Sequence, residues 1–299
     1  MAQMNISAVK KTFTRNTRLW LNKRGYVLKR IGDQYATALY QSSLSDSELA
    51  NRPFYNIGAG TFWHPHWTNV DFVSEWYGGV QKNVVHHDLM SLKPLPIESG
   101  TAKIFYTSHT IEHIKETAVI KLFEEAHRAL EVGGVFRITT GPDAETDYRA
   151  LLAGDANWFY WDNYYTHPDV YGHIYTAPAN SVSLAERWLH HVASPLSHID
   201  KSPSENKYSE NEIWEILKSK SLEDALDFFC GQCEFDPQRP NNHISWWTHE
   251  KIMSYLKDAG FKNVYRSGHN QSVSPFLRNS PLFDSTHPQM SVYVEAIKT

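Results

Sequence analysis

A glycine-rich turn between two short apolar runs is the feature that most constrains how this chain can fold. Residues 54–57 form an apolar run that meets Gly58 and Gly60, and a second short run ends at Asp71. Glycine lets the backbone turn sharply and approach a ligand without a Cβ in the way. An acid at the tip of the next strand is placed to accept hydrogen bonds from a ribose diol. The pattern therefore predicts a buried strand that delivers a nucleotide-like ligand to a sheet edge.

Strand-like and helix-like segments alternate after this turn. We expect strands at residues 67–72, 83–87, 103–107 and 135–140, and a helix with apolar residues at 119, 123, 126 and 130 that ends at Gly133-Gly134. Such alternation predicts a parallel sheet that is covered on both faces and binds ligands at the carboxyl ends of its strands. The 11 positions from Gly60 to Asp71 are too few for a full crossover helix. The N-terminal helices are expected to cover that sheet face instead.

Several longer motifs accompany the turn, in a specific order and spacing. They are Asn56-Ile-Gly-Ala-Gly60, Thr68-Asn-Val-Asp71, His87-Asp-Leu89, Ser108-His-Thr-Ile-Glu-His113, Glu125-Ala-His-Arg-Ala-Leu-Glu-Val-Gly-Gly134, Leu256-Lys-Asp-Ala-Gly-Phe261 and Ser291-Val-Tyr-Val-Glu-Ala296. On these motifs, residues 53–145 and 244–299 resemble the class I S-adenosylmethionine-dependent methyltransferases, in particular a group often encoded among bacterial glycan-biosynthesis genes.

The resemblance implies a fold, a cofactor and a set of site residues. The fold is α/β, with a Rossmann-like, mostly parallel seven-stranded sheet, an antiparallel last strand, an N-terminal helical arm, and a helical, aromatic insertion after strand five. The cofactor is S-adenosylmethionine, released as S-adenosylhomocysteine. Gly58 and Gly60 would border its methionine part, Asp71 the ribose and Asp88 the adenine amino group. The full set of implied cofactor-binding residues is Asn56, Gly58, Ala59, Gly60, Asp71, Phe72, Asp88, Leu89 and Ser108.

The chain divides into three parts on this reading. Residues 1–52 form a basic helical arm and linker, and residues 53–145 with 244–299 form the methyltransferase core. Residues 146–243 form an insertion that includes Trp158-Phe-Tyr-Trp161. Its aromatic residues favour a lid over the acceptor, and a helical subdomain with its own small core is the alternative.

The chemistry of methyl transfer to a hydroxyl requires an aligned acceptor and a general base. His109, at the end of the fourth strand, is the preferred candidate for the base, followed by Asp143 and His243. The expected acceptor is a hydroxyl of a saccharide or glycan precursor. The alternatives are another small molecule or natural product, and a non-catalytic protein of the same fold. A nicotinamide dehydrogenase is disfavoured because its Gly-x-Gly-x-x-Gly pattern fails at Trp63.

Two residue groups have spacing that could hold a metal. Cys230, Cys233, His243 and His249 could supply four zinc ligands, although reduced structural cysteines are the favoured interpretation. Asp143, Glu145 and Asp147 could hold Mg²⁺, but acids at the start of a helix more often cap it. The sequence therefore predicts no metal site, with Mg²⁺ as the less favoured alternative.

Charge is distributed unevenly along the chain. Residues 1–32 carry eight basic and no acidic side chains, a net charge of +8, which leaves −12 for residues 33–299 because the whole chain carries −4. The arm could dock on its own acidic domain or contact an anionic membrane or polyanion. The acidic remainder disfavours nucleic acid as a partner. With no signal-peptide core and no apolar run near the roughly 18 residues of a membrane span, a cytoplasmic location is expected, with peripheral association at the inner membrane face as a further option.

Overall fold

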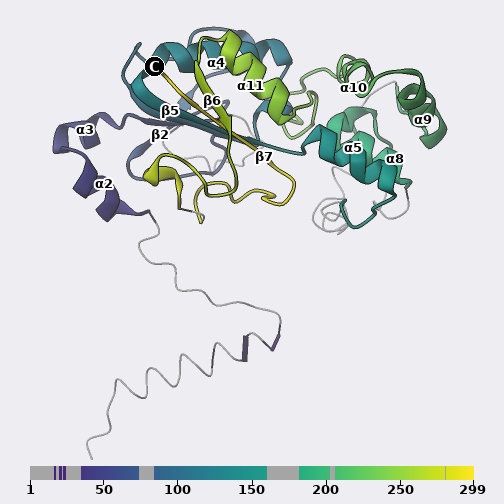
Figure 1. The fold of residues 1–299 in the computed structure, drawn as a ribbon, viewed down its shortest axis with the longest axis horizontal. Helices are drawn as coiled ribbons and strands as arrows, with labels where there is room; N and C mark the ends of the chain where they lie inside the picture. The colour runs from purple at the N-terminus through teal and green to yellow at the C-terminus, as the bar shows by residue number, and fades with distance from the viewer. Residues whose placement is uncertain are drawn as a thin grey trace, which may run out of the picture.

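The apolar runs of the sequence form a single seven-stranded sheet within the described residues (Figure 1). Its strand order is β3-β2-β1-β4-β5-β7-β6. This computed structural model describes Thr17, Trp20, Leu21 and residues 23–24, 35–73, 84–159, 182–202, 206–279 and 281–299. The strands are β1 (Phe54–Ile57), β2 (Trp67–Asp71), β3 (Val84–His86), β4 (Ala102–Ser108), β5 (Leu130–Thr140), β6 (Asn263–Arg266) and β7 (Val292–Ile297). Neighbouring strands are parallel except at β7, which runs antiparallel to β5 and β6. The predicted sheet with its antiparallel last strand is confirmed.

The strand register brings the ends of the central strands to one edge of the sheet. Ile57 pairs with both Val70 and Thr107, and Asp71 pairs with His86. The residues that follow these pairs therefore lie together at the carboxyl edge, as the sequence predicted.

One face of the sheet is covered by two helices. Figure 1 shows α4 (Glu116–Ala129) and α11 (His249–Asp258) together on this side. Their buried residues, such as Leu122, Phe123 and Leu256, pack with Phe105 and Phe136 of the sheet into one apolar core. The predicted helix is present, but it ends at Ala129 rather than at Gly133-Gly134, because Leu130 already pairs with Ala102 as part of β5.

The opposite face lacks a crossover helix between β1 and β2. Tyr40 of α2 (Thr37–Ser43) packs there instead, and it accepts a hydrogen bond from Trp67 Nε1 at 2.6 Å. Phe276 and Phe283, from the long connection between β6 and β7, complete this aromatic core. A second short helix, α3 (Asp46–Asn51), follows α2 and is capped by Ser45. The N-terminal segment thus contributes part of the cover, as expected, and the connection supplies the rest.

A buried ion cluster fixes the β6–β7 connection to the sheet. Arg137 of β5 is fully buried and donates to Asp284 Oδ1 at 3.0 Å and to Glu295 Oε1 at 2.9 Å. It also donates to the carbonyl oxygen of Gly268 at 2.8 Å. The Arg137 side chain of β5 therefore contacts this loop at Gly268 and Asp284, and β7 at Glu295.

The insertion after β5 has a core of its own. Helices α5 (Ala144–Ala153), α8 (Leu184–Val192), α9 (Glu210–Ser219) and α10 (Leu222–Cys230) lie beyond one end of the sheet (Figure 1). Trp188, Phe229 and Trp246 are buried among them. The insertion core thus starts at α5, slightly before residue 146. The two short 3-10 helices η3 (Ile111–His113) and η5 (Ser194–Leu196) lie where this insertion meets the sheet edge.

The basic part of the predicted N-terminal arm, residues 1–32, lies almost entirely outside the described residues, as do residues 160–181 of the insertion. No helix in the described part of the chain combines the length and apolarity needed to cross a membrane.

Candidate functional site

The glycine turn after β1 has the conformation that the sequence predicted. Gly58 and Gly60 have φ values of +68° and +54°. A Cβ on Gly58 would lie 2.2 Å from the Thr110 side chain, so the tight approach between these two chain segments requires glycine. Asn56 and Ala59 flank the turn and are buried.

Asp71 joins this turn to the end of β2. Its Oδ2 accepts a hydrogen bond from the Gly60 backbone N–H at 2.7 Å, and its Oδ1 accepts one from the Phe72 N–H at 2.7 Å. Hydrogen bonds to the ionised form favour the carboxylate and hold it in one orientation. The acid is thereby fixed at the point where β1 and β2 both end.

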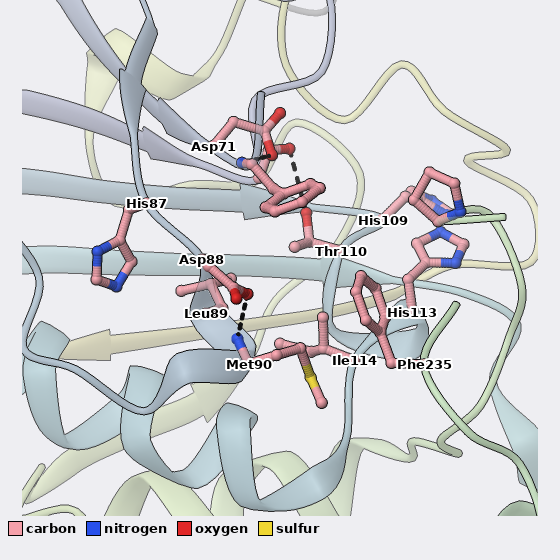
Figure 2. Close-up of a pocket in the computed structure, with 13 residues that line it drawn as sticks. Asp71, His87, Asp88, Leu89, Met90, His109, Thr110, His113, Ile114 and Phe235 are labelled. Atoms are coloured by element: carbon pink, nitrogen blue, oxygen red, sulfur yellow. Dashed lines mark hydrogen bonds between the residues drawn. The ribbon is translucent and has the colours of Figure 1, made fainter. Parts of the chain in front are cut away.

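A pocket opens beside Asp71. Asp88 stands in its wall and caps the 3-10 helix η2 (Leu89–Ser91), because its Oδ1 accepts from the Met90 N–H at 2.9 Å. Figure 2 shows His87 at one end of this first pocket, and His109 and His113 at the other. Its lining residues are Gly58, Asp71, Phe72, His87, Asp88, Leu89, Met90, His109, Thr110, His113, Ile114, Phe235 and Pro240. Five of the predicted cofactor-binding residues therefore line one pocket.

A second pocket adjoins the first, because Gly58 and His109 line both. It contains the other four predicted cofactor-binding residues, Asn56, Ala59, Gly60 and Ser108. Its remaining walls are Tyr35, Thr61, Phe62, Trp63, Tyr106, Pro281, Leu282, Ser285 and Thr286. Most of these were not predicted as site residues.

His109 lies where the two pockets meet and makes a contact through each ring nitrogen. Its Nδ1 is 3.0 Å from Glu112 Oε1, and its Nε2 is 2.9 Å from Ser291 Oγ. Because a carboxylate can only accept, Nδ1 carries the proton, and the neutral ring has its lone pair on Nε2. Gly141 permits this arrangement, since a Cβ there would lie 3.0 Å from His109 Cε1.

Glu112 is a buried carboxylate that the sequence analysis left without a role. Its Oε2 accepts from Thr140 Oγ1 at 2.8 Å. Burial would raise the pKa of this carboxyl, but His113 and the hydrogen bond from His109 outweigh burial and lower that pKa to about 2. An ionised Glu112 can therefore orient His109 and stabilise a positive charge on its ring.

Asp143 and His243, the other two candidates for the base, do not line either pocket. Asp143 precedes α5 and accepts from Thr146 Oγ1 at 2.7 Å, and burial raises its pKa. The ring of His243 lies 4.9 Å from that of His113, and burial lowers the pKa of His243 to about 3. His243 is thus close to the His109–Glu112 pair, on the side of the insertion.

The two metal groupings considered from the sequence are not formed. Glu145 pairs with Arg149, whereas Asp147 is buried and binds Trp158 Nε1 and His191 Nδ1, so neither joins Asp143. Both cysteines are buried in the insertion core, where their thiols donate to backbone carbonyls and burial raises their pKa values. Reduced structural cysteines therefore fit the structure.

Comparison with known proteins finds similarity only to solved structures. No protein-family model and no curated protein match the chain. A SAM-dependent methyltransferase from Archaeoglobus fulgidus is 12% identical, with 82% of this chain and 85% of that chain covered and a TM-score of 0.37. One from Mesorhizobium loti is 14% identical, with 89% and 99% covered and a TM-score of 0.38. Such low values leave the function to be argued from the site itself.

Proposed function

We propose that this protein is an S-adenosylmethionine-dependent methyltransferase that acts on a saccharide or glycan hydroxyl. The observation that carries the proposal is the Asp71 carboxylate, held by the N–H groups of Gly60 and Phe72 in one pocket with Gly58 and Asp88. A carboxylate fixed at the end of the second strand, beside a glycine turn, suits the diol of a bound nucleoside.

The residues of the first pocket fit the adenosine part of the methyl donor. Asp71 would accept from the ribose hydroxyls and Asp88 from the adenine amino group. Leu89, Met90 and Ile114 supply an apolar wall for the ring. Gly58 and Gly60 would border the methionine part. A side chain on Gly58 would clash with Thr110. When bound, the donor supplies an electrophilic methyl group on its sulfonium sulfur.

The second pocket supports a saccharide as acceptor. The rings of Tyr35 and Trp63 lie 5.1 Å apart, edge to face, and Trp63 remains partly exposed. Aromatic rings of this kind pack against the C–H face of a sugar, and the nearby side chains of Thr61, Ser285 and Thr286 can bond its hydroxyls. This pocket meets the first one at His109, where the acceptor and the methyl donor would have to meet.

His109 is the proposed general base. Its Nε2 lone pair would take the proton from the acceptor hydroxyl once that hydroxyl replaces Ser291 Oγ, which lies 2.9 Å from this nitrogen. Glu112 accepts from Nδ1–H throughout and stabilises the imidazolium that forms. Asp143 and His243 remain the alternatives for this role.

Calorimetric titration tests the proposal at its central residue. S-adenosylhomocysteine should bind in preference to NAD, and Asp71→Ala should weaken its binding by about 1–3 kcal/mol, because charge-assisted hydrogen bonds are lost. Asp258→Ala, at the exposed end of α11, is the matched control and should leave the affinity unchanged. Tight NAD binding without any response to S-adenosylhomocysteine would contradict the proposal.

A transfer assay with labelled methyl donor identifies the acceptor. The panel should contain nucleotide sugars, free glycans and aromatic natural products. We expect label to appear in a saccharide. Transfer only to a non-saccharide would refute the acceptor class and leave methyl transfer itself intact.

A further inference from the structure

Three side chains next to His109 converge on one point. One oxygen of Glu112 and one ring nitrogen each of His113 and His243 all lie within 4.8 Å of one another. The His113 Nε2 to Glu112 Oε1 distance is 4.0 Å, and the two rings pack edge to face. The cluster combines one buried carboxylate with two partly accessible imidazoles.

Backbone hydrogen bonds hold the cluster together across the junction of the core and the insertion. Glu112 and His113 belong to η3, directly after β4, whereas His243 lies 130 positions later in the chain. The Glu112 carbonyl oxygen accepts from the Ile244 N–H at 2.8 Å. His243 exchanges two hydrogen bonds with Ser194, through its N–H to Ser194 Oγ at 3.0 Å and through its carbonyl oxygen. The three side chains are therefore positioned by main-chain contacts on both sides.

Both imidazoles are oriented in the manner of metal ligands. His113 Nδ1 lies 3.1 Å from the Asn242 carbonyl oxygen, and His243 Nδ1 contacts the His191 carbonyl oxygen. A carbonyl oxygen only accepts, so in each neutral ring Nδ1 carries the proton and Nε2 carries the lone pair. A backbone carbonyl on the other ring nitrogen is the usual arrangement around a metal-bound histidine.

We propose that Glu112, His113 and His243 bind one divalent transition-metal ion, with Zn²⁺ as the reference ion. Two imidazoles and one carboxylate suit Zn²⁺ and related ions, whereas Mg²⁺ prefers oxygen ligands alone. Metal bonds of about 2.0–2.2 Å require the three side chains to move slightly inward. Three protein ligands leave a coordination position open, and His113 lines the first pocket, so an oxygen ligand can reach the ion from that pocket.

Metal binding to the full chain, stripped with EDTA, tests the site without any methyl transfer. Co²⁺ serves as the spectroscopic probe and Zn²⁺ as the titrant in calorimetry. We expect one ion per chain and visible Co²⁺ absorption. Glu112→Gln, His113→Asn and His243→Asn should each weaken binding by at least about 100-fold, since even outer-shell partners account for 10–100-fold. His249→Asn is the matched control, because this nearby histidine lies outside the proposed ligand set, and it should bind normally.

A cysteine variant separates loss of the metal site from loss of folding, because it replaces one ligand by another. Circular dichroism of each metal-free variant reports its folding. His243→Cys should retain Co²⁺ and add a cobalt–thiolate charge-transfer band in the near ultraviolet. A stripped wild-type chain that takes up neither ion would overturn the proposal. So would Co²⁺ uptake that survives His113→Asn in a folded chain, or a folded His243→Cys chain without the thiolate band.

Discussion

The environment of His109 shows how a few atoms set the chemistry of this site. Glu112 holds Nδ1, Ser291 contacts Nε2, and Gly141 leaves room for the ring. His109 itself has a φ of +49°, a conformation that most side chains avoid. The residue is thus held at the meeting point of two pockets by its neighbours on three chain segments.

Removing this imidazole should slow the chemical step alone. His109→Asn retains some hydrogen bonding but no base, so kcat should fall by roughly 10²–10⁴-fold, the usual contribution of general-base catalysis. The affinity for S-adenosylhomocysteine should be nearly unchanged, and steady-state kinetics with the identified acceptor measures both. His198→Asn, a histidine in the insertion that pairs with Glu186, is the matched control. Full turnover in His109→Asn would exclude this residue as the base. Loss in Asp143→Asn would then move the base to Asp143, and loss in His243→Asn would move it to His243 only if metal binding is unchanged in that variant.

Site residues could be predicted where they belong to short continuous motifs. Gly58 follows β1 directly, Asp71 is the last residue of β2, and Asp88 lies two positions after β3, so the parallel sheet alone brings them to one edge. The partnership of His113 with His243 could not be predicted, because the contact depends on how the insertion folds back onto η3. Most of the remaining wall of the second pocket was missed because Tyr35 and Leu282 come from distant loops.

At the level of elements, the sheet could be predicted and its cover only in part. Strand order follows from alternating strands and helices, but the face without a crossover helix is filled by Tyr40 and Phe283 from opposite ends of the chain. No periodicity in either segment indicates this packing. The helix predicted before β5 was too long, because the apolar pattern of α4 continues into the strand at Leu130.

The ion cluster on β5 should dominate the stability of the β6–β7 connection. Arg137→Leu would leave Asp284 and Glu295 buried without their cation, which should lower the free energy of unfolding by about 3–5 kcal/mol. Urea denaturation followed by tryptophan fluorescence measures it. The control Arg149→Leu breaks only an exposed pair with Glu145 and should cost less than about 1 kcal/mol. Equal effects of the two substitutions would show that the buried cluster adds nothing specific.

The whole molecule combines an acidic body with a basic N-terminal segment. We expect residues 1–32, with their charge of +8, to attract anionic vesicles in a co-sedimentation assay. Removing these residues should abolish the attraction, and added salt should weaken it by screening. Vesicles of neutral lipid are the control. Salt-independent binding, or a truncated chain that no longer folds, would instead favour docking of the arm on its own acidic body.

The anchoring of the β6–β7 connection has a consequence for how this protein can diversify. Asp284 is fixed by Arg137, and Ser291 is fixed beside His109, whereas Ser285 and Thr286 lie between these two anchors in the wall of the second pocket. Substitutions at these two positions should reshape the wall of the proposed acceptor pocket while the proposed base, His109, and the first pocket keep their places. A library of substitutions at Ser285 and Thr286 is therefore a direct way to search for variants with altered acceptor selectivity.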